Sequence, residues 1–199
     1  MDLIARLVFL GSLLSVAFFP VAGSGAEPPL CQRTATVVPH HAVEVANALR
    51  IEVESFVVPV PKGPERTLLG GGELTLVYAD GAVLVLGTGP LPPGGVSGRA
   101  AAEIPALIFG ANLCSVSNSS DPVRSLAAML KPKYFEAAHH VTMSRLGKLV
   151  YYLSDSQWQG FSGRAFVTSE RYPNLYLQID AKGMDFDRFQ RIVLGVRAD

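Results

Sequence analysis

An α+β fold is predicted, in which helices cover a largely antiparallel sheet within a single layered domain. Three observations lead to it. Alternating apolar and polar residues, typical of strands, recur in two blocks of the chain. Within each block the runs are joined by short turns, so neighbouring strands should pair antiparallel. Helical patterns lie between the blocks and at the C-terminal end, where they can cover the sheet.

Residues 1–26 have the pattern of a secretory signal peptide. Arg6 precedes an uncharged apolar run, and the small residues from Val21 onward offer a cleavage site after Ala26. The apolar run is shorter than the roughly 20 residues that span a bilayer as a helix. We therefore expect the leader to be removed and the mature chain to be periplasmic or secreted, with no stable membrane span. Retention of the leader as an anchor is the alternative.

The mature chain is predicted to begin with an extended N-terminal arm over residues 27–44, where prolines are frequent, followed by a single α+β domain over 45–199. Cys31 lies in the arm, and Cys114 is the other cysteine of the chain. Two cysteines in an exported protein most simply pair with each other, so we expect a disulfide. Two buried free thiols are the alternative.

The first block of strands covers residues 51–86. Residues 51–60 alternate as one strand, which Pro59 should end and keep out of a central position in a sheet. Asp80-Gly81 lies between two apolar runs, which favours a hairpin over residues 73–86 with a two-residue primed turn. The glycines and prolines of residues 87–98 then indicate a loop.

Two helices are expected between the blocks. The first spans residues 100–113 and is interrupted by Pro105. The second begins at the capping residue Asp121 and stops at Pro132. Its buried stripe should consist of Leu126, Met129 and Leu130.

The second block predicts two hairpins and a closing helix. One hairpin spans residues 139–154 with its turn at Gly147, and the other spans 163–180 with its turn at Pro173. Asp185 should cap the last helix. Its apolar face would be made of Phe186, Phe189, Val193 and Val196.

The balance of charges argues against a nucleic-acid partner. Lys and Arg together number 17, as do Asp and Glu, so the formal net charge is zero. No basic excess is present to attract nucleic acid, and we expect no nucleic-acid partner. The glycine-rich segments 70–72 and 87–89 lack the features of a phosphate-binding loop, and no cofactor is expected.

No motif predicts catalysis or metal binding. The glycine-flanked serines of residues 95–98 and 160–163 lack the second glycine of a nucleophile elbow. The histidines come as two adjacent pairs, His40-His41 and His139-His140. Adjacent residues on a strand point to opposite faces, so we expect no single pair to chelate an ion. Catalytic residues and metal ligands are both predicted to be absent.

Aromatic residues are concentrated in the last third of the chain, and about half should face the core. Trp158 and Phe161 lie in a turn rich in Gly, Ser and Gln, where burial is harder to explain. Aromatic side chains at such positions often anchor protein partners. We therefore predict that Trp158 and Phe161 form a partner-binding surface.

Three segments resemble the PsbP/Mog-like α/β/α sandwich family. Residues 56–63 resemble its opening strand and proline-glycine break, and residues 149–153 its central meander. Residues 175–179, followed by 186–196, are similar to its closing strand and helix. The resemblance spans residues 45–199. It implies a non-catalytic accessory, adaptor or periplasmic immunity protein, and it transfers no catalytic residue.

The sequence thus favours a non-enzymatic exported protein that binds another protein, one concrete form being an immunity protein that neutralises a toxic effector. Two alternatives stay open. One is a small-molecule or lipid carrier with an apolar cavity. The other is an envelope hydrolase with a dispersed site, for which the candidate residues are His139, His140, Ser154 and Asp155.

Overall fold

The computed structural model of the chain describes residues 28–41, 43–45, 47–89, 101–114, 120–157 and 160–198. Within them, an eight-stranded sheet has the order β1-β7-β8-β9-β10-β6-β5-β4. All neighbours are antiparallel except β1, which runs parallel to β7. The predicted α+β fold is confirmed. The strands are β1 (Thr36–Val37), β4 (Arg66–Gly70), β5 (Glu73–Val77), β6 (Val83–Gly89), β7 (His140–Leu146), β8 (Leu149–Ser156), β9 (Ser162–Ser169) and β10 (Tyr176–Lys182).

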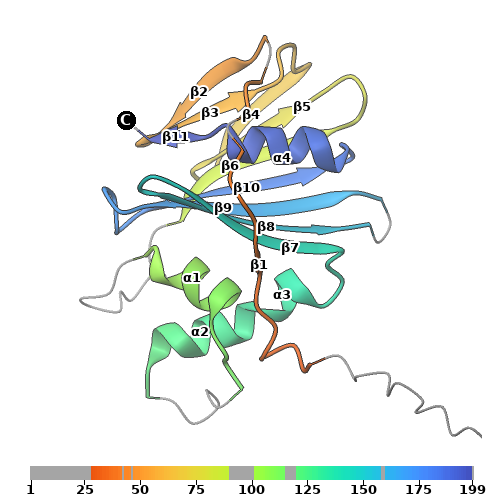
Figure 1. Cartoon of the computed structure of the whole chain (residues 1–199). Helices are drawn as coiled ribbons and strands as arrows, with labels where there is room; N and C mark the ends of the chain where they lie inside the picture. The colour runs from red at the N-terminus through yellow and green to blue at the C-terminus, as the bar shows by residue number, and fades with distance from the viewer. Residues whose placement is uncertain are drawn as a thin grey trace, which may run out of the picture.

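Each face of the large sheet is covered by a different layer (Figure 1). One face carries α4 (Phe186–Leu194) and a small sheet of order β11-β3-β2. The opposite face carries three helices over β7, β8 and β9. The remaining elements are β2 (Leu49–Val53), β3 (Phe56–Val60), β11 (Arg197–Ala198), α1 (Glu103–Gly110), α2 (Pro122–Leu130) and α3 (Pro132–Phe135).

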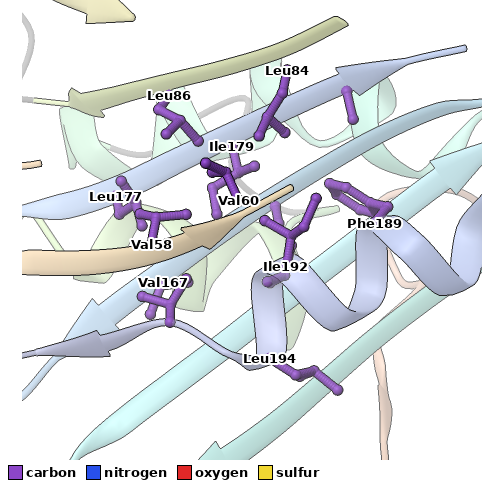
Figure 2. Packing of buried hydrophobic residues seen from close by; sticks show 14 of the residues in the cluster. Val58, Val60, Leu84, Leu86, Val167, Leu177, Ile179, Phe189, Ile192 and Leu194 are labelled. Atoms are coloured by element: carbon purple, nitrogen blue, oxygen red, sulfur yellow. The ribbon is translucent and has the colours of Figure 1, made fainter. Parts of the chain in front are cut away.

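The main hydrophobic core lies between the large sheet and the layer of α4 and the small sheet. Phe189 and Ile192 of α4 point toward the sheet, and Val58 of β3 and Ile179 of β10 lie in the same layer (Figure 2). These side chains are at most 1% exposed. Full burial of such a side chain contributes about 1.5–3 kcal/mol, so this layer supplies much of the driving force for folding.

A second core, rich in aromatic rings, lies beneath the three helices. The ring of Phe109 in α1 lies 5.3–6.2 Å from the rings of Tyr134, Phe135, Tyr152 and Phe166. The predicted disulfide joins the arm to this layer, since Cys31 and Cys114 are bonded. That pairing is confirmed.

The segment predicted as one strand over residues 51–60 is a hairpin of β2 and β3. Glu54 adopts φ 53°, and the chain reverses so that Val53 pairs with Phe56. The prediction failed because this turn contains no glycine or proline at its centre. Pro59 lies in β3, the middle strand of the small sheet, but β11 pairs only with Phe56 and Val57. Pro59 therefore faces a ladder partner on one side alone, which tolerates its missing N–H.

The hairpin around Asp80-Gly81 is confirmed, but its turn is longer than predicted. Tyr78 exchanges backbone hydrogen bonds with Gly81 and Ala82, each 2.9 Å long. Gly81 alone in this turn adopts positive φ, at 80°. This geometry is a three-residue loop with a glycine bulge, in place of the primed two-residue turn. The preceding strand β4, fully exposed at the sheet edge, was not predicted.

The helices begin near their predicted positions. Pro105 lies within the first turn of α1, where its missing N–H costs nothing, and does not interrupt it. Asp121 caps α2 by accepting hydrogen bonds from two backbone N–H groups. The predicted buried stripe is partly wrong, because Val123 and Ala127 are buried and Met129 is 66% exposed. Helix α2 ends at Leu130, and Pro132 is the first residue of α3.

The two C-terminal hairpins and the closing helix are also found. Gly147 forms the turn of β7 and β8, and β9 pairs with β10 as predicted. Asp185 caps α4. The leader and Trp158 lie outside the described residues, and no helix among the described residues is long and apolar enough to cross a membrane.

Candidate functional site

Three side chains with metal-binding chemistry meet where β7 begins and β8 ends. His139 directly precedes β7, His140 is its first residue, and Asp155 lies opposite His140 in the β7–β8 register. The turn at Gly147 sets that register. Their ligand atoms lie within 4.8 Å of one another. We call these three residues the histidine–aspartate cluster.

The hydrogen bonds of the cluster converge on Asp155. Its Oδ1 lies 2.9 Å from the Nδ1 of His140 and accepts a hydrogen bond from the His140 backbone N–H at 3.0 Å. The Nδ1 atoms of His139 and His140 are 3.1 Å apart. The His139 N–H also donates to the backbone carbonyl of Asp155 at 2.7 Å. Backbone and side chains together hold the three groups in place.

The cluster is half-open to solvent. The side chain of Asp155 is 0% exposed and that of His140 is 43% exposed. The ring of Phe186, the first residue of α4, stacks on the His140 ring at 4.7 Å. Among the described residues, no hydrogen-bond donor meets Oδ2 of Asp155, although this atom is buried. A buried carboxylate oxygen normally has a partner, so this one stands out.

His139 and His140 come together, although adjacent residues of a strand were expected to point to opposite faces. His139 does not lie in the strand: it precedes β7, and its ring lies against that of His140. The other pair does not join this cluster. The ring of His40 packs on Tyr151 at 4.8 Å, and burial lowers the pKa of His40.

The four residues proposed for a dispersed hydrolase site are only partly assembled. His139, His140 and Asp155 come together. Ser154 is buried, and its hydroxyl donates a 2.6 Å hydrogen bond to the backbone carbonyl of Tyr134 in α3. Since neighbours in a strand point to opposite faces, Ser154 lies on the other face of the sheet from Asp155. This serine is not placed to act with the two histidines.

A groove of about 760 Å³ is a second candidate site, on the sheet face that carries α1–α3. Its floor is formed by β9 and β10, and its wall by the ends of the helices. It is larger than the depression of about 400 Å³ beside the small sheet. Its lining includes Tyr134, Phe161, Arg164, Tyr176, Gln178 and Asp180, together with the basic residues Lys133 and Lys182.

The groove combines aromatic rings with a charged pair. The Nε of Arg164 lies 3.8 Å from Oδ1 of Asp180, and Gln178 donates to the other oxygen of Asp180 at 2.6 Å. The guanidinium of Arg164 also lies 5.9 Å from the Tyr134 ring centroid. Burial, together with the charge of Asp180, raises the pKa of Tyr134 far above its usual value. The phenol therefore stays neutral.

Phe161 lies at the rim of this groove and is half-buried. Its ring packs against Phe189 of α4 at 5.8 Å, so part of its surface belongs to the main core. Trp158, the other residue predicted to bind a partner, falls outside the described residues. The sequence did not point to Arg164, Tyr176 or Asp180 as surface residues of one groove. The register that pairs Asp180 with Arg164 across β9 and β10 brings them together.

These features define the chain as a layered α+β protein with an open groove on one sheet face. No family model and no curated protein sequence matches it. Among solved structures, it is similar to the Saccharomyces cerevisiae Ran-binding protein Mog1p, with a TM-score of 0.39 and 8% sequence identity. The alignment covers 76% of this chain and 95% of that one. A likeness this weak carries no argument about function.

Proposed function

We propose that this protein is an exported, non-enzymatic protein that binds another protein through the groove along β9 and β10. The carrying observation is the chemistry of that groove: two tyrosines, a phenylalanine rim and an arginine–aspartate pair on an open sheet face. Tyr and Arg, together with Trp, are enriched among the residues that carry most of the binding energy in protein interfaces. The layered architecture also agrees with the PsbP/Mog-like family, whose membership is part of this proposal.

The charges support a protein partner. The groove is lined by three basic residues, Lys133, Arg164 and Lys182, and by one acid, Asp180, while the whole chain has no net charge. A groove with a local basic excess suits an acidic, polar surface on a protein partner. The Cys31–Cys114 disulfide supports export, because disulfides persist in oxidising compartments.

Site-directed photo-crosslinking tests the binding proposal. A photo-reactive phenylalanine analogue at Gln178 in the groove should crosslink one exported protein, identified by mass spectrometry. The same analogue at Leu146, which is 48% exposed at the end of β7, should not. Crosslinks of equal yield at both positions, or none at Gln178, would reject the groove as the binding surface.

A charge reversal gives a matched test with the purified partner. Arg164→Glu places a second acid beside Asp180 and should weaken binding by about 10-fold or more, as expected for an interface arginine. Arg145→Glu is the control, since Arg145 also forms an exposed ion pair, with Glu170 at 2.9 Å. Equal affinities for the two variants would contradict the proposal.

The immunity form makes a separate prediction. The crosslinked partner, produced alone in the periplasm, should arrest growth, and coexpression with this chain should restore growth. Arg164→Glu should fail to restore it. A harmless partner would remove the immunity form and leave protein binding in place.

A further inference from the structure

We propose that His139, His140 and Asp155 bind a divalent transition-metal ion, best suited to Zn²⁺, at the open end of the β7–β8 hairpin. This site is separate from the proposed groove, since Asp155 faces the layer of α4 and the groove lies on the opposite face. The proposal therefore does not depend on the proposed function.

Three Lewis bases converge at this site. The Nδ1 of His140 lies 3.1 Å from the Nδ1 of His139 and 2.9 Å from Oδ1 of Asp155. A single ring nitrogen carries at most one hydrogen, so it cannot satisfy both neighbours as a donor. One cation placed between the three atoms would give each of them a bond.

Asp155 is a buried carboxylate whose charge is only partly compensated. Its side chain is fully buried, and Oδ1 is held by the backbone N–H and the ring of His140. Oδ2 is also buried, and no donor in the described part of the chain reaches it. A buried carboxylate costs free energy unless its charge is compensated, and a metal ion is a common compensation. Asp155 lies opposite His140 in the β7–β8 ladder, and this pairing holds its carboxylate beside the His140 ring.

The donor set selects the class of metal. Two imidazole nitrogens and one carboxylate oxygen suit Zn²⁺ and neighbouring first-row ions better than Ca²⁺ or Mg²⁺, which prefer oxygen alone. Three protein ligands leave a coordination position for water, and His140 is 43% exposed toward solvent. The disulfide removes both cysteines from competition, since no free cysteine remains. The site therefore fits an exchangeable, solvent-accessible ion.

Zinc titration of the full chain tests the proposal. The protein is purified without a polyhistidine tag, stripped with a chelator and titrated with Zn²⁺ by calorimetry. We expect a single saturable site in the wild type. His139→Gln should weaken the affinity by at least about 10-fold, and His139→Gln/His140→Gln should abolish the site. His41→Gln is the matched control, and it should bind like the wild type.

A second readout guards against variants that fail to fold. Imidazole NMR signals of His139 and His140 should shift on zinc addition while those of His40 and His41 stay unchanged, which uses only the wild-type chain. Asp155→Asn, isosteric with the native residue, should lose binding and keep its circular dichroism spectrum. Absence of saturable uptake, equal affinity in the double variant, or shifts confined to His40 and His41 would each overturn the proposal.

Discussion

Lys131 places a charged group almost completely inside the helical layer, with 1% of its surface exposed. Its Nζ donates a 2.7 Å hydrogen bond to the carbonyl of Ala111, the residue that ends α1. The ammonium also lies 5.0 Å from the centroid of the Phe135 ring. Burial lowers the pKa of Lys131 to about 8. The Lys131 side chain thus connects the C-terminal ends of α1 and α2, and its burial disfavours the charged form of its amine.

This burial predicts a particular dependence of stability on pH. The pKa of Lys131 is about 8 in the folded chain and 10.5 for an unperturbed lysine. Between these values the unfolded chain holds the proton and the folded chain does not, so the free energy of unfolding should rise with pH. The Lys131→Met variant should lack this rise. Urea denaturation of both proteins at pH values from 8 to 10 measures it.

Tyr151 limits the pH range over which that experiment can be interpreted. Burial raises the pKa of Tyr151 from 10.0 to about 12, so the folded chain keeps a proton that the unfolded chain loses above pH 10. Stability should therefore fall again in strongly alkaline solution.

The outcome that would contradict the Lys131 prediction is an equal rise in the free energy of unfolding between pH 8 and 10 in the wild type and in Lys131→Met. It would show that Lys131 does not titrate in this range.

Some features of single residues could be predicted from the sequence, and others could not. Asp121 and Asp185 were predicted as helix caps because an acid precedes a helical pattern, a purely local signal. The meeting of His139 with His140 was missed because it depends on where β7 begins. A strand boundary that shifts by one residue decides whether two neighbouring rings diverge or meet. Nothing in the residue types fixes that boundary.

At the scale of elements, α4 depends on its first turn for its position over the sheet. Asp185 Oδ1 accepts a 2.6 Å hydrogen bond from the backbone N–H of Arg188. The helix then buries Phe189, Ile192 and Val193 in the main core. The cap therefore stabilises the end of an element whose packing surface is large.

Removal of this cap gives a quantitative prediction. Asp185→Ala should lower the free energy of unfolding by about 1 kcal/mol, since one helix N–H loses its acceptor. Asp187→Ala is the control: this first-turn acid interacts with the helix dipole alone, worth about 0.3–1 kcal/mol at an exposed site. Chemical denaturation of both variants measures the difference. A larger loss in Asp187→Ala would contradict the assigned roles.

Elements differed in how clearly the sequence specified them. The hairpins around Gly81 and Gly147 were predicted because each turn contains a glycine between apolar runs, and both glycines do adopt positive φ. The β2–β3 hairpin was missed because Glu54, a residue that rarely adopts positive φ, occupies its turn. Strand β4 was missed because all five of its residues are exposed, so no alternation of burial appears in its sequence.

At the scale of the whole molecule, the disulfide connects the arm to the helical layer across 83 residues of sequence. The Cys31 carbonyl also accepts a hydrogen bond from the Leu113 N–H at 2.9 Å. Beyond this point the arm adds β1 to the edge of the large sheet, beside β7. The arm is therefore held by a covalent bond, by backbone hydrogen bonds to the helical layer and by a strand ladder.

The closed loop predicts a large effect on stability. The double variant Cys31→Ser/Cys114→Ser should lower the free energy of unfolding by about 2–5 kcal/mol, mainly because its unfolded chain regains freedom. Urea denaturation with and without reductant measures the loss. Reductant should destabilise the wild type by a similar amount and leave the variant unchanged. A wild type insensitive to full reduction would show that the loop contributes nothing.

The layered fold was predictable as a class, because alternation, short turns and helical stripes agree with one another. The division of the covering layers was not. The small sheet, in which β3 pairs with β11 from the far end of the chain, depends on contacts between residues such as Phe56 and Ala198. The groove likewise exists because α1–α3 leave β9 and β10 partly uncovered. Both the small sheet and the groove depend on residues that are far apart in the sequence.

The bond between Cys31 and Cys114 also determines how the protein behaves when its backbone is cut. Hydrolysis of any peptide bond between these residues yields two fragments that remain one covalent molecule. Both fragments migrate together on a non-reducing gel and separate only after a reducing agent is added. A protease that cuts the chain once between Cys31 and Cys114 therefore releases no piece of it.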